Sequence, residues 1–138
     1  MVEKPNMDSS KNRKDHEQPA VIAKYGWRFH HMGIPTNTPR PGEQYLEDWK
    51  MYVSGFQTSP YGIEWMRFEE DSPVSELVKT VPHLAFEVDD LEIALEDKHL
   101  ISDVYSPSEG VRIAMIIDNG APIELLKFLE FPEDRMMK

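Results

Sequence analysis

Four side chains that could bind a divalent metal ion recur in a duplicated pattern. The stretch HMGI that begins at His31 resembles HLAF at His83, and IEWMRF around Glu64 resembles IELLKF around Glu124. The two histidines are 52 residues apart and the two glutamates are 60 apart, so the second half holds a loop of about 8 extra residues. Two imidazoles and two carboxylates form a complete ligand set for one divalent ion.

Each histidine has a very small neighbour on its own strand face. Because side chains alternate between the two faces of a strand, His31 shares a face with Gly33, and His83 shares one with Ala85. The residues that point the other way are apolar. This pattern predicts a concave sheet face that leaves room for a ligand. His30 is an alternative ligand, but the repeat aligns it with a proline, which cannot bind a metal.

Each glutamate lies among apolar side chains. Glu64 shares its face with Met66 and Phe68, and Glu124 is flanked by apolar residues in the same way. A carboxylate in such a position is costly to bury unless a partner offsets its charge. One histidine or glutamate of this kind is usually structural or solvent-facing. The recurrence of both types in register is what favours a metal site.

The expected elements follow the same order in both halves. Strand, short helix and further strands, without regular alternation, indicate an α+β fold rather than a doubly wound sheet. In the first half we expect a strand over 25–36, an amphipathic helix over 41–49, and strands over 51–58 and 62–69. An acidic linker at 70–81 leads to a strand over 81–89, a helix capped by Asp89 or Asp90 with Leu91, Ala94 and Leu95 buried, and strands over 100–105, 111–118 and 121–129.

The organisation that follows is one domain with a polar extension. We expect a disordered tail over residues 1–20 and a single domain over 21–138, built from modules 25–70 and 80–130.

Composition limits the partners. The net charge of −10 argues against nucleic acid, and no apolar run is long enough to cross a membrane. The absence of cysteine excludes disulfides and thiolate ligands. It is compatible with a cytoplasmic protein, which is the location we expect.

The motifs HHMGIPT, VPHLAFEVDDLEIAL and APIELLKF, in this order, resemble the vicinal oxygen chelate superfamily over about residues 27 to 129. This superfamily includes glyoxalases, epimerases, bleomycin-resistance proteins and extradiol dioxygenases. The resemblance implies paired βαβββ modules that form a half-open, glyoxalase-like barrel around one metal. It places the ligands at His31, Glu64, His83 and Glu124. The span from His31 to Glu64 is short for the family, which predicts trimmed strands or loops in the first module.

The resemblance also implies a chemistry. A glutamate at position 64 is typical of the lyases and epimerases, whereas a set of two histidines and one glutamate is typical of the dioxygenases. We therefore expect a metal-dependent lyase or isomerase acting on a small α-oxo or α-hydroxy compound, with Glu124 or Glu64 as the base. The metal would be one divalent Zn, Ni, Co, Mn or Fe ion. A metal-free binding protein of the bleomycin-resistance type and an iron-dependent dioxygenase are the alternatives.

Other residues are weaker candidates. Arg112 is favoured over Arg28 and Arg67 as a group that binds a substrate anion. Four aromatic residues could line a pocket or belong to the core: Trp27, Tyr52, Phe56 and Tyr105. Because half-barrel modules leave strand edges exposed, we expect a homodimer.

Overall fold

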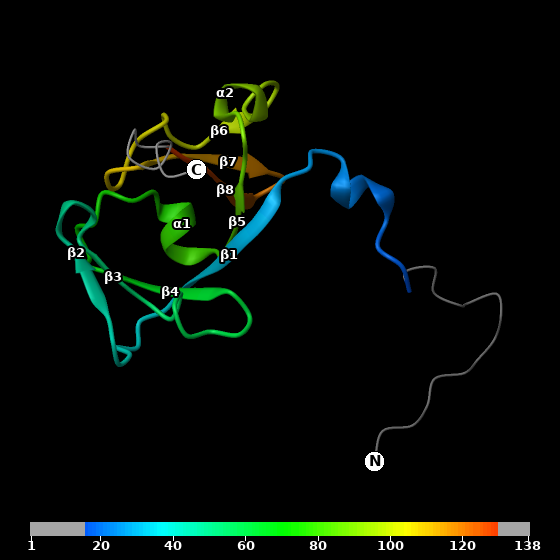
Figure 1. Ribbon diagram of the computed structural model, residues 1–138. Coiled ribbons are helices and arrows are strands. Elements are labelled where there is room, and N and C mark those ends of the chain that lie inside the picture. The colour runs from blue at the N-terminus through cyan, green and yellow to red at the C-terminus, as the bar shows by residue number, and fades with distance from the viewer. Residues whose placement is uncertain (1–15, 130–138) are drawn as a thin grey trace, which may run out of the picture.

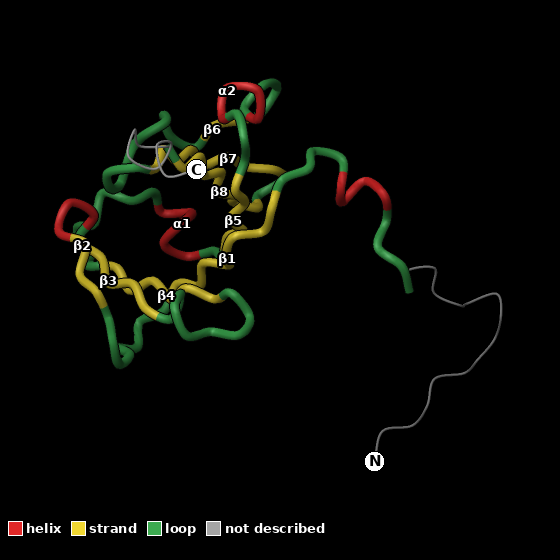
Figure 2. Tube along the Cα trace, in the orientation of Figure 1, coloured by secondary structure: helices red, strands yellow, loops and turns green. Residues whose placement is uncertain are grey.

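One curled, unclosed sheet of eight strands dominates the fold of residues 16–129, the part of the chain that the computed structural model describes (Figure 1). The sheet bends into an arc, and the short helix α1 lies within it (Figure 2). The strands are β1 (Arg28–Pro35), β2 (Gln44–Leu46), β3 (Met51–Ser54), β4 (Ile63–Phe68), β5 (His83–Glu87), β6 (His99–Leu100), β7 (Val111–Asp118) and β8 (Ala121–Phe128). The α-helices are α1 (Glu76–Thr80) and α2 (Leu91–Ala94).

The two halves of the sheet have equivalent strand orders, counted inward from each edge. The full order runs β2-β3-β4-β1-β5-β8-β7-β6, so two four-stranded halves meet where β1 pairs antiparallel with β5. Within each half the inner pair is parallel, β1 with β4 and β5 with β8. The sequence repeat is therefore a structural repeat. The α+β class and the half-open barrel of paired modules are confirmed.

Helix α2 covers the outer face of the second half. Asp90 caps it, because its carboxylate accepts a hydrogen bond from the Ile93 amide at 3.0 Å. Leu91 and Ala94 point inward and form one buried cluster with side chains of the sheet, including Leu125. The predicted cap at position 90 and these two predicted core positions are confirmed.

The first half has no such helix between β1 and β2. The predicted helix over 41–49 is wrong: its first part is β2, which pairs with β3 and places Tyr45 opposite Tyr52, and its end is a 3-10 turn at Glu47–Trp49. The helical spacing covered too few residues to outweigh cross-strand pairing. Lys50 then adopts a left-handed conformation with φ 48° that closes the hairpin. The missing helix accounts for the short span from His31 to Glu64.

Three other boundaries differ from the prediction. The strand expected over 51–58 stops at Ser54, because Gly55 turns the chain with φ 94°. The linker at 70–81 contains α1, whose first turn is capped by Ser75.

The strand expected over 100–105 is reduced to the two residues of β6. Residues 101–110 instead form a long connection to β7, in which Tyr105 makes a single bridge to Ile113.

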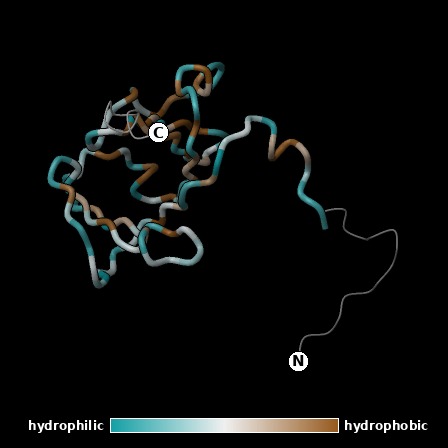
Figure 3. The backbone as a smooth tube through the Cα atoms, viewed as in Figure 1, coloured by the Kyte–Doolittle hydropathy of each residue, from teal (hydrophilic) through white to brown (hydrophobic). Residues whose placement is uncertain are grey.

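The chain enters the sheet through an apolar segment that projects from the body. The 3-10 turn Ala20–Ala23 has no buried residue, and Val21 and Ile22 are each about two-thirds exposed. Figure 3 shows this segment as a hydrophobic stretch on the arm outside the sheet. Of the predicted tail at 1–20, residues 1–15 lie outside the described part. No helix within residues 16–129 is long and apolar enough to cross a membrane.

Candidate metal centre

The four central strands bring the predicted ligands to one point on the concave face. Gly33 on β1 and Ala85 on β5 lie at the middle of this arrangement. Each is paired on its two neighbouring strands with two of the predicted ligands. The pairs are Gly33 with His83, Gly33 with Glu64, Ala85 with His31, and Ala85 with Glu124. The pseudo-symmetry of the sheet thus brings the His and Glu of one repeat close to those of the other at the junction of the halves.

Gly33 provides the space that the ring of His83 occupies. A Cβ atom at position 33 would lie 2.1 Å from Cε1 of His83 and 2.6 Å from each ring nitrogen. No side chain could be accommodated there without moving the ring. The small residue that the alternation pattern placed beside the histidines is therefore a geometric requirement of the site.

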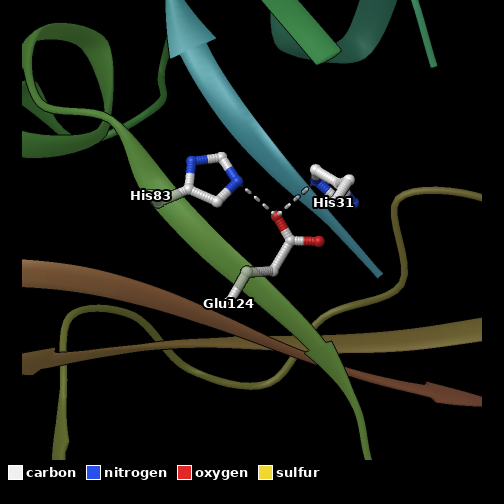
Figure 4. Close-up of side chains that lie close together, drawn as sticks. All are labelled: His31, His83 and Glu124. Carbon is white, nitrogen blue, oxygen red and sulfur yellow. Dashed lines mark ion pairs between the residues drawn. The ribbon is translucent and has the colours of Figure 1, made fainter. Parts of the chain in front are cut away.

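Three of the predicted ligands converge closely, as Figure 4 shows. His83 Nε2 lies 3.0 Å from Oε1 of Glu124, and His31 Nε2 lies 3.9 Å from the same oxygen. One potential ligand atom from each of the three residues lies within 4.8 Å of the other two. Such a cluster has the dimensions of a metal site in which side chains close by small movements around an ion.

Glu64 lies beside this cluster rather than within it. Its Oε1 is 3.8 Å from His31 Nε2, and its side chain is 24% exposed, against 12% for Glu124. The structure therefore brings all four predicted residues into one site, with three in close convergence and the fourth at its open side.

The two histidines carry buried ring nitrogens that make no well-aligned hydrogen bond within residues 16–129, although His83 Nε2 lies 3.0 Å from Oε1 of Glu124. Both residues are almost fully buried, with exposed fractions of 4% for His31 and 3% for His83. His31 Nε2 and both ring nitrogens of His83 lack hydrogen-bond partners. A buried polar atom without a partner costs about 1–3 kcal/mol. Two such imidazoles facing a carboxylate fit a divalent ion, which would satisfy the inward nitrogens and offset the carboxylate charge.

The protonation states suit metal binding. Burial lowers the pKa of His31 to about 4, and the charge of Glu124 opposes this shift only in part. Burial acts to raise the pKa of Glu124, but the close approach of His83 and the charges of the histidines hold it below its ordinary value. A neutral imidazole and an ionised carboxylate are the forms that bind metals. Burial, with a contribution from Glu124, raises the pKa of Glu64 to about 7.

His30 supports the ring of His31. The two Nδ1 atoms are 2.8 Å apart, so one of them is protonated and donates a hydrogen bond to the other. The ring of His30 also stacks on Phe56, with centroids 4.9 Å apart. Because the hydrogen bond to His30 uses Nδ1 of His31, Nε2 is the nitrogen that faces the carboxylates. The structure gives His30, the alternative ligand, the position of an outer partner of His31.

A cavity of about 350 Å³ opens beside the centre. Glu64, Glu124 and His83 form its polar end, and Met66 and Phe68 line it on the face that alternation had assigned to Glu64. The long connection at 101–110 contributes further wall residues, among them Tyr105. Sequence reasoning missed most of the wall, including Trp49, because it placed that residue on a helix.

The arginines proposed for substrate binding lie elsewhere. Arg112 is on the opposite face of β7 from the cavity residues, and its guanidinium is 3.0 Å from a carboxylate oxygen of Glu92. Arg28 and Arg67 also form ion pairs with acidic side chains. The site as described is therefore acidic and apolar.

Comparisons with known proteins support the fold. No protein-family model and no curated protein sequence matches the chain. Among solved structures, a hypothetical protein from Bacillus halodurans C-125 matches with a TM-score of 0.57 at 15% identity, covering 76% of this chain and 96% of the other. Methylmalonyl-CoA epimerase from Mycobacterium tuberculosis matches with a TM-score of 0.49 at 19% identity, covering 75% and 89%. A glyoxalase family protein from Bacillus cereus matches with a TM-score of 0.34 at 16% identity, covering 75% and 95%.

The first of these likenesses and the paired-module topology agree with the resemblance found in the sequence. The chain has the fold that this resemblance implied, a half-open barrel of paired modules. His31, His83 and Glu124 could hold a metal ion.

Proposed function

We propose that the protein is a metal-dependent lyase or isomerase of the glyoxalase and epimerase type. It would remove a proton from the carbon beside a carbonyl of a small α-oxo or α-hydroxy compound. One observation carries the proposal: buried, unpartnered imidazole nitrogens of His31 and His83 face one oxygen of Glu124 beside a cavity. These three residues would hold one divalent ion, and Zn, Ni, Co, Mn and Fe all accept this donor set.

The bound ion would supply Lewis acidity toward the oxygens of the substrate. The chain itself must then accept a proton from carbon, and we propose Glu64 as the acceptor. It borders the cavity, it lies outside the closest cluster, and its side chain is the more exposed of the two carboxylates. Glu124 is the alternative base, but it would have to leave the imidazole of His83. The apolar walls keep water away from the carboxylate.

Metal analysis tests the centre directly. Protein purified without chelator should hold about one divalent ion per chain, and His83→Ala should lose most of it. His99→Ala is the matched control, because His99 is exposed on β6 and does not line the cavity. Equal metal content in wild type and in both His31→Ala and His83→Ala would rule out the centre.

Deuterium exchange tests the reaction. Metal-loaded protein would be incubated with α-hydroxy ketones in D₂O, and deuterium uptake at the carbon would be followed by NMR. Glu64→Gln should abolish uptake while keeping the metal, whereas Glu124→Gln should lose both. Uptake that is unchanged in Glu64→Gln would remove this residue from the role of base.

The closest cluster also favours a second candidate function. Two histidines and one carboxylate with open positions form the ligand set of non-haem Fe(II) oxygenases. Oxygen consumption by the iron-loaded protein with catechols tests this reading. Ring cleavage that survives Glu64→Ala would place the protein among the dioxygenases.

The apolar cavity leaves a third candidate, a metal-free protein that binds or sequesters a small molecule. Binding of a ligand by correctly folded protein that takes up no metal would favour this candidate over both enzymes.

A further inference from the structure

Within residues 16–129, no lysine or arginine lines the cavity beside the metal centre. The ionisable side chains of its wall are Glu64, Glu124, His83 and Tyr105. Both carboxylates lie at the end where the substrate would react. An anionic group in this space would therefore meet like charges and find no cation.

The basic side chains of the described chain are used elsewhere. Five of them form ion pairs with acidic residues: Arg28, Lys50, Arg67, Lys79 and Arg112. Three others lie over aromatic rings, Arg40 over Trp65 and both Lys24 and Lys98 over Tyr25. Lys127 alternates with Glu124 on β8, so it points to the other face of the sheet. None of these cations is free to turn toward the cavity without breaking a contact or crossing the sheet.

The wall itself is soft and apolar. Met51, Met66 and Met115 come from three different strands and are all buried. Methionine side chains adapt their shape to irregular apolar ligands. The rings of Trp49 and Tyr105 pack 4.9 Å apart on another side of the space. Together these groups form a surface that suits a ring or a short aliphatic chain.

Tyr105 adds a neutral donor to this surface. Burial and the charge of Glu124 raise the pKa of Tyr105 to about 12, so its hydroxyl keeps its proton. Such a hydroxyl can donate a hydrogen bond to a substrate oxygen without introducing a charge. Ser75 and Ser102 add further neutral hydroxyls to the wall.

From these observations we infer that the site accepts a neutral, largely apolar molecule that carries two adjacent oxygens at one end. Carboxylate, sulfonate or phosphate groups would be excluded from the cavity, because a charge buried without a partner loses its hydration and gains nothing in return. A divalent ion would offer a cation only at the polar end, so the rest of the wall would still lack one within residues 16–129. The two oxygens rest on the proposed function. The neutrality rests on the cavity wall alone.

A matched pair of fluorescent probes tests the neutrality in metal-free protein. N-phenylnaphthylamine is neutral, and anilinonaphthalene sulfonate has the same rings with one added anion. We expect the neutral probe to bind at least about tenfold more tightly than the anion, which corresponds to ~1.4 kcal/mol. Equal affinities, or tighter binding of the sulfonate, would overturn the inference.

Two lysine variants on one loop locate the probes. Ser102 is exposed and borders the cavity, whereas Ser108 is exposed and does not border it. Ser102→Lys should therefore reduce the preference for the neutral probe several-fold, and Ser108→Lys, with the same net charge, should leave it unchanged. If both variants change the preference equally, the probes bind outside the cavity and the inference fails.

The outcome is independent of the metal. Because neither probe requires an ion, a clear neutral preference in a chain that takes up no metal would sustain this inference and reject the proposed function. A chain that binds metal but shows no preference would do the reverse. In the metal-loaded protein, deuterium exchange should be faster with hydroxyacetophenone than with its ring-carboxylated analogue.

Discussion

Gly33→Ala should damage the metal centre without touching a ligand. The new Cβ would lie 2.1 Å from Cε1 of His83, where 3.4 Å is the lower edge of an ordinary contact. The ring must therefore move by about 1.3 Å or rotate out of its pocket. The side chain of His83 is only 2% exposed and borders the cavity, so the displaced ring must move against packed atoms or into the cavity, away from its position facing Glu124.

The size of the effect follows from the tolerance of metal coordination. Ligand distances are held to within about 0.2 Å, so a shift of this size removes His83 as a ligand. Loss of the outer support of a ligand typically weakens metal binding ~10- to 100-fold, and we expect Gly33→Ala to reach at least this range. The added methyl group also overpacks the strand pair, at a cost of ~1–3 kcal/mol in the free energy of unfolding.

The symmetric position supplies the control. Ala85 is fully buried and has the same relation to His31 and Glu124 that Gly33 has to the other two ligands. Ala85→Gly removes a methyl group and costs roughly 1 kcal/mol of stability, but it creates no clash. We expect it to keep the metal within a few-fold of wild type.

Both variants would be measured in two assays. Competition with a chromophoric chelator gives the metal affinity, and urea unfolding in excess chelator gives the stability of the metal-free chain. A Gly33→Ala protein that is folded and binds metal as tightly as wild type would refute the argument that this glycine makes room for a ligand. Equal loss of metal in Ala85→Gly would show that the effect is one of general stability.

Three further outcomes are expected. Burial raises the pKa of Glu64 to about 7 from 4.5, so the folded metal-free chain holds this proton more tightly than the unfolded chain. The protonated carboxyl therefore contributes to the free energy of unfolding in full below pH 4.5, and this contribution is lost as the pH rises through 7. The stability of Glu64→Gln relative to wild type should therefore increase by on the order of 2 kcal/mol between about pH 5 and 8, as urea unfolding in chelator would report. Leu91→Ala opens a cavity in the cluster under α2 and should lower the free energy of unfolding by ~2–5 kcal/mol, while metal content measured by elemental analysis stays at the wild-type level. We further propose that the chain is a homodimer, and light scattering at tens of micromolar should give twice 16.0 kDa, with Ile22→Asp on the exposed arm shifting the equilibrium toward monomer; a wild-type monomer would contradict this proposal.

The sequence predicts the centre of the molecule better than its edges. Strand alternation around His31 and His83 was informative because both strands are flanked on both sides by others, so their faces are fixed by pairing. The duplicated motifs then indicated which residues of the two halves are equivalent, and the structure supplied their register. Such information is local and periodic, which is the kind that a single sequence carries reliably.

The edges could not be predicted because tertiary pairing outweighed local spacing. Tyr45 and Trp49 recur at a helical interval, yet the backbone around Tyr45 bonds to β3. The outer face that a helix would cover is closed instead by side chains. The guanidinium of Arg40 stacks 3.7 Å from the ring centre of Trp65 and donates a hydrogen bond to Ser54 at 3.0 Å. The spacing of these three residues along the sequence does not predict that contact.

This division between centre and edges bears on function. The ligands sit on the four inner strands, where the two halves are alike, so the duplicated pattern was enough to locate them. The cavity wall combines side chains of the repeated strands with parts in which the halves differ, namely the connection at 101–110 and the turn that carries Trp49. Chemistry that depends on the ligands can thus be inferred from the repeat, whereas selectivity had to wait for the structure. If the wall sets selectivity, Ser102→Lys should change which ligands bind, while Gly33→Ala should lower metal affinity and stability and leave that selectivity unchanged.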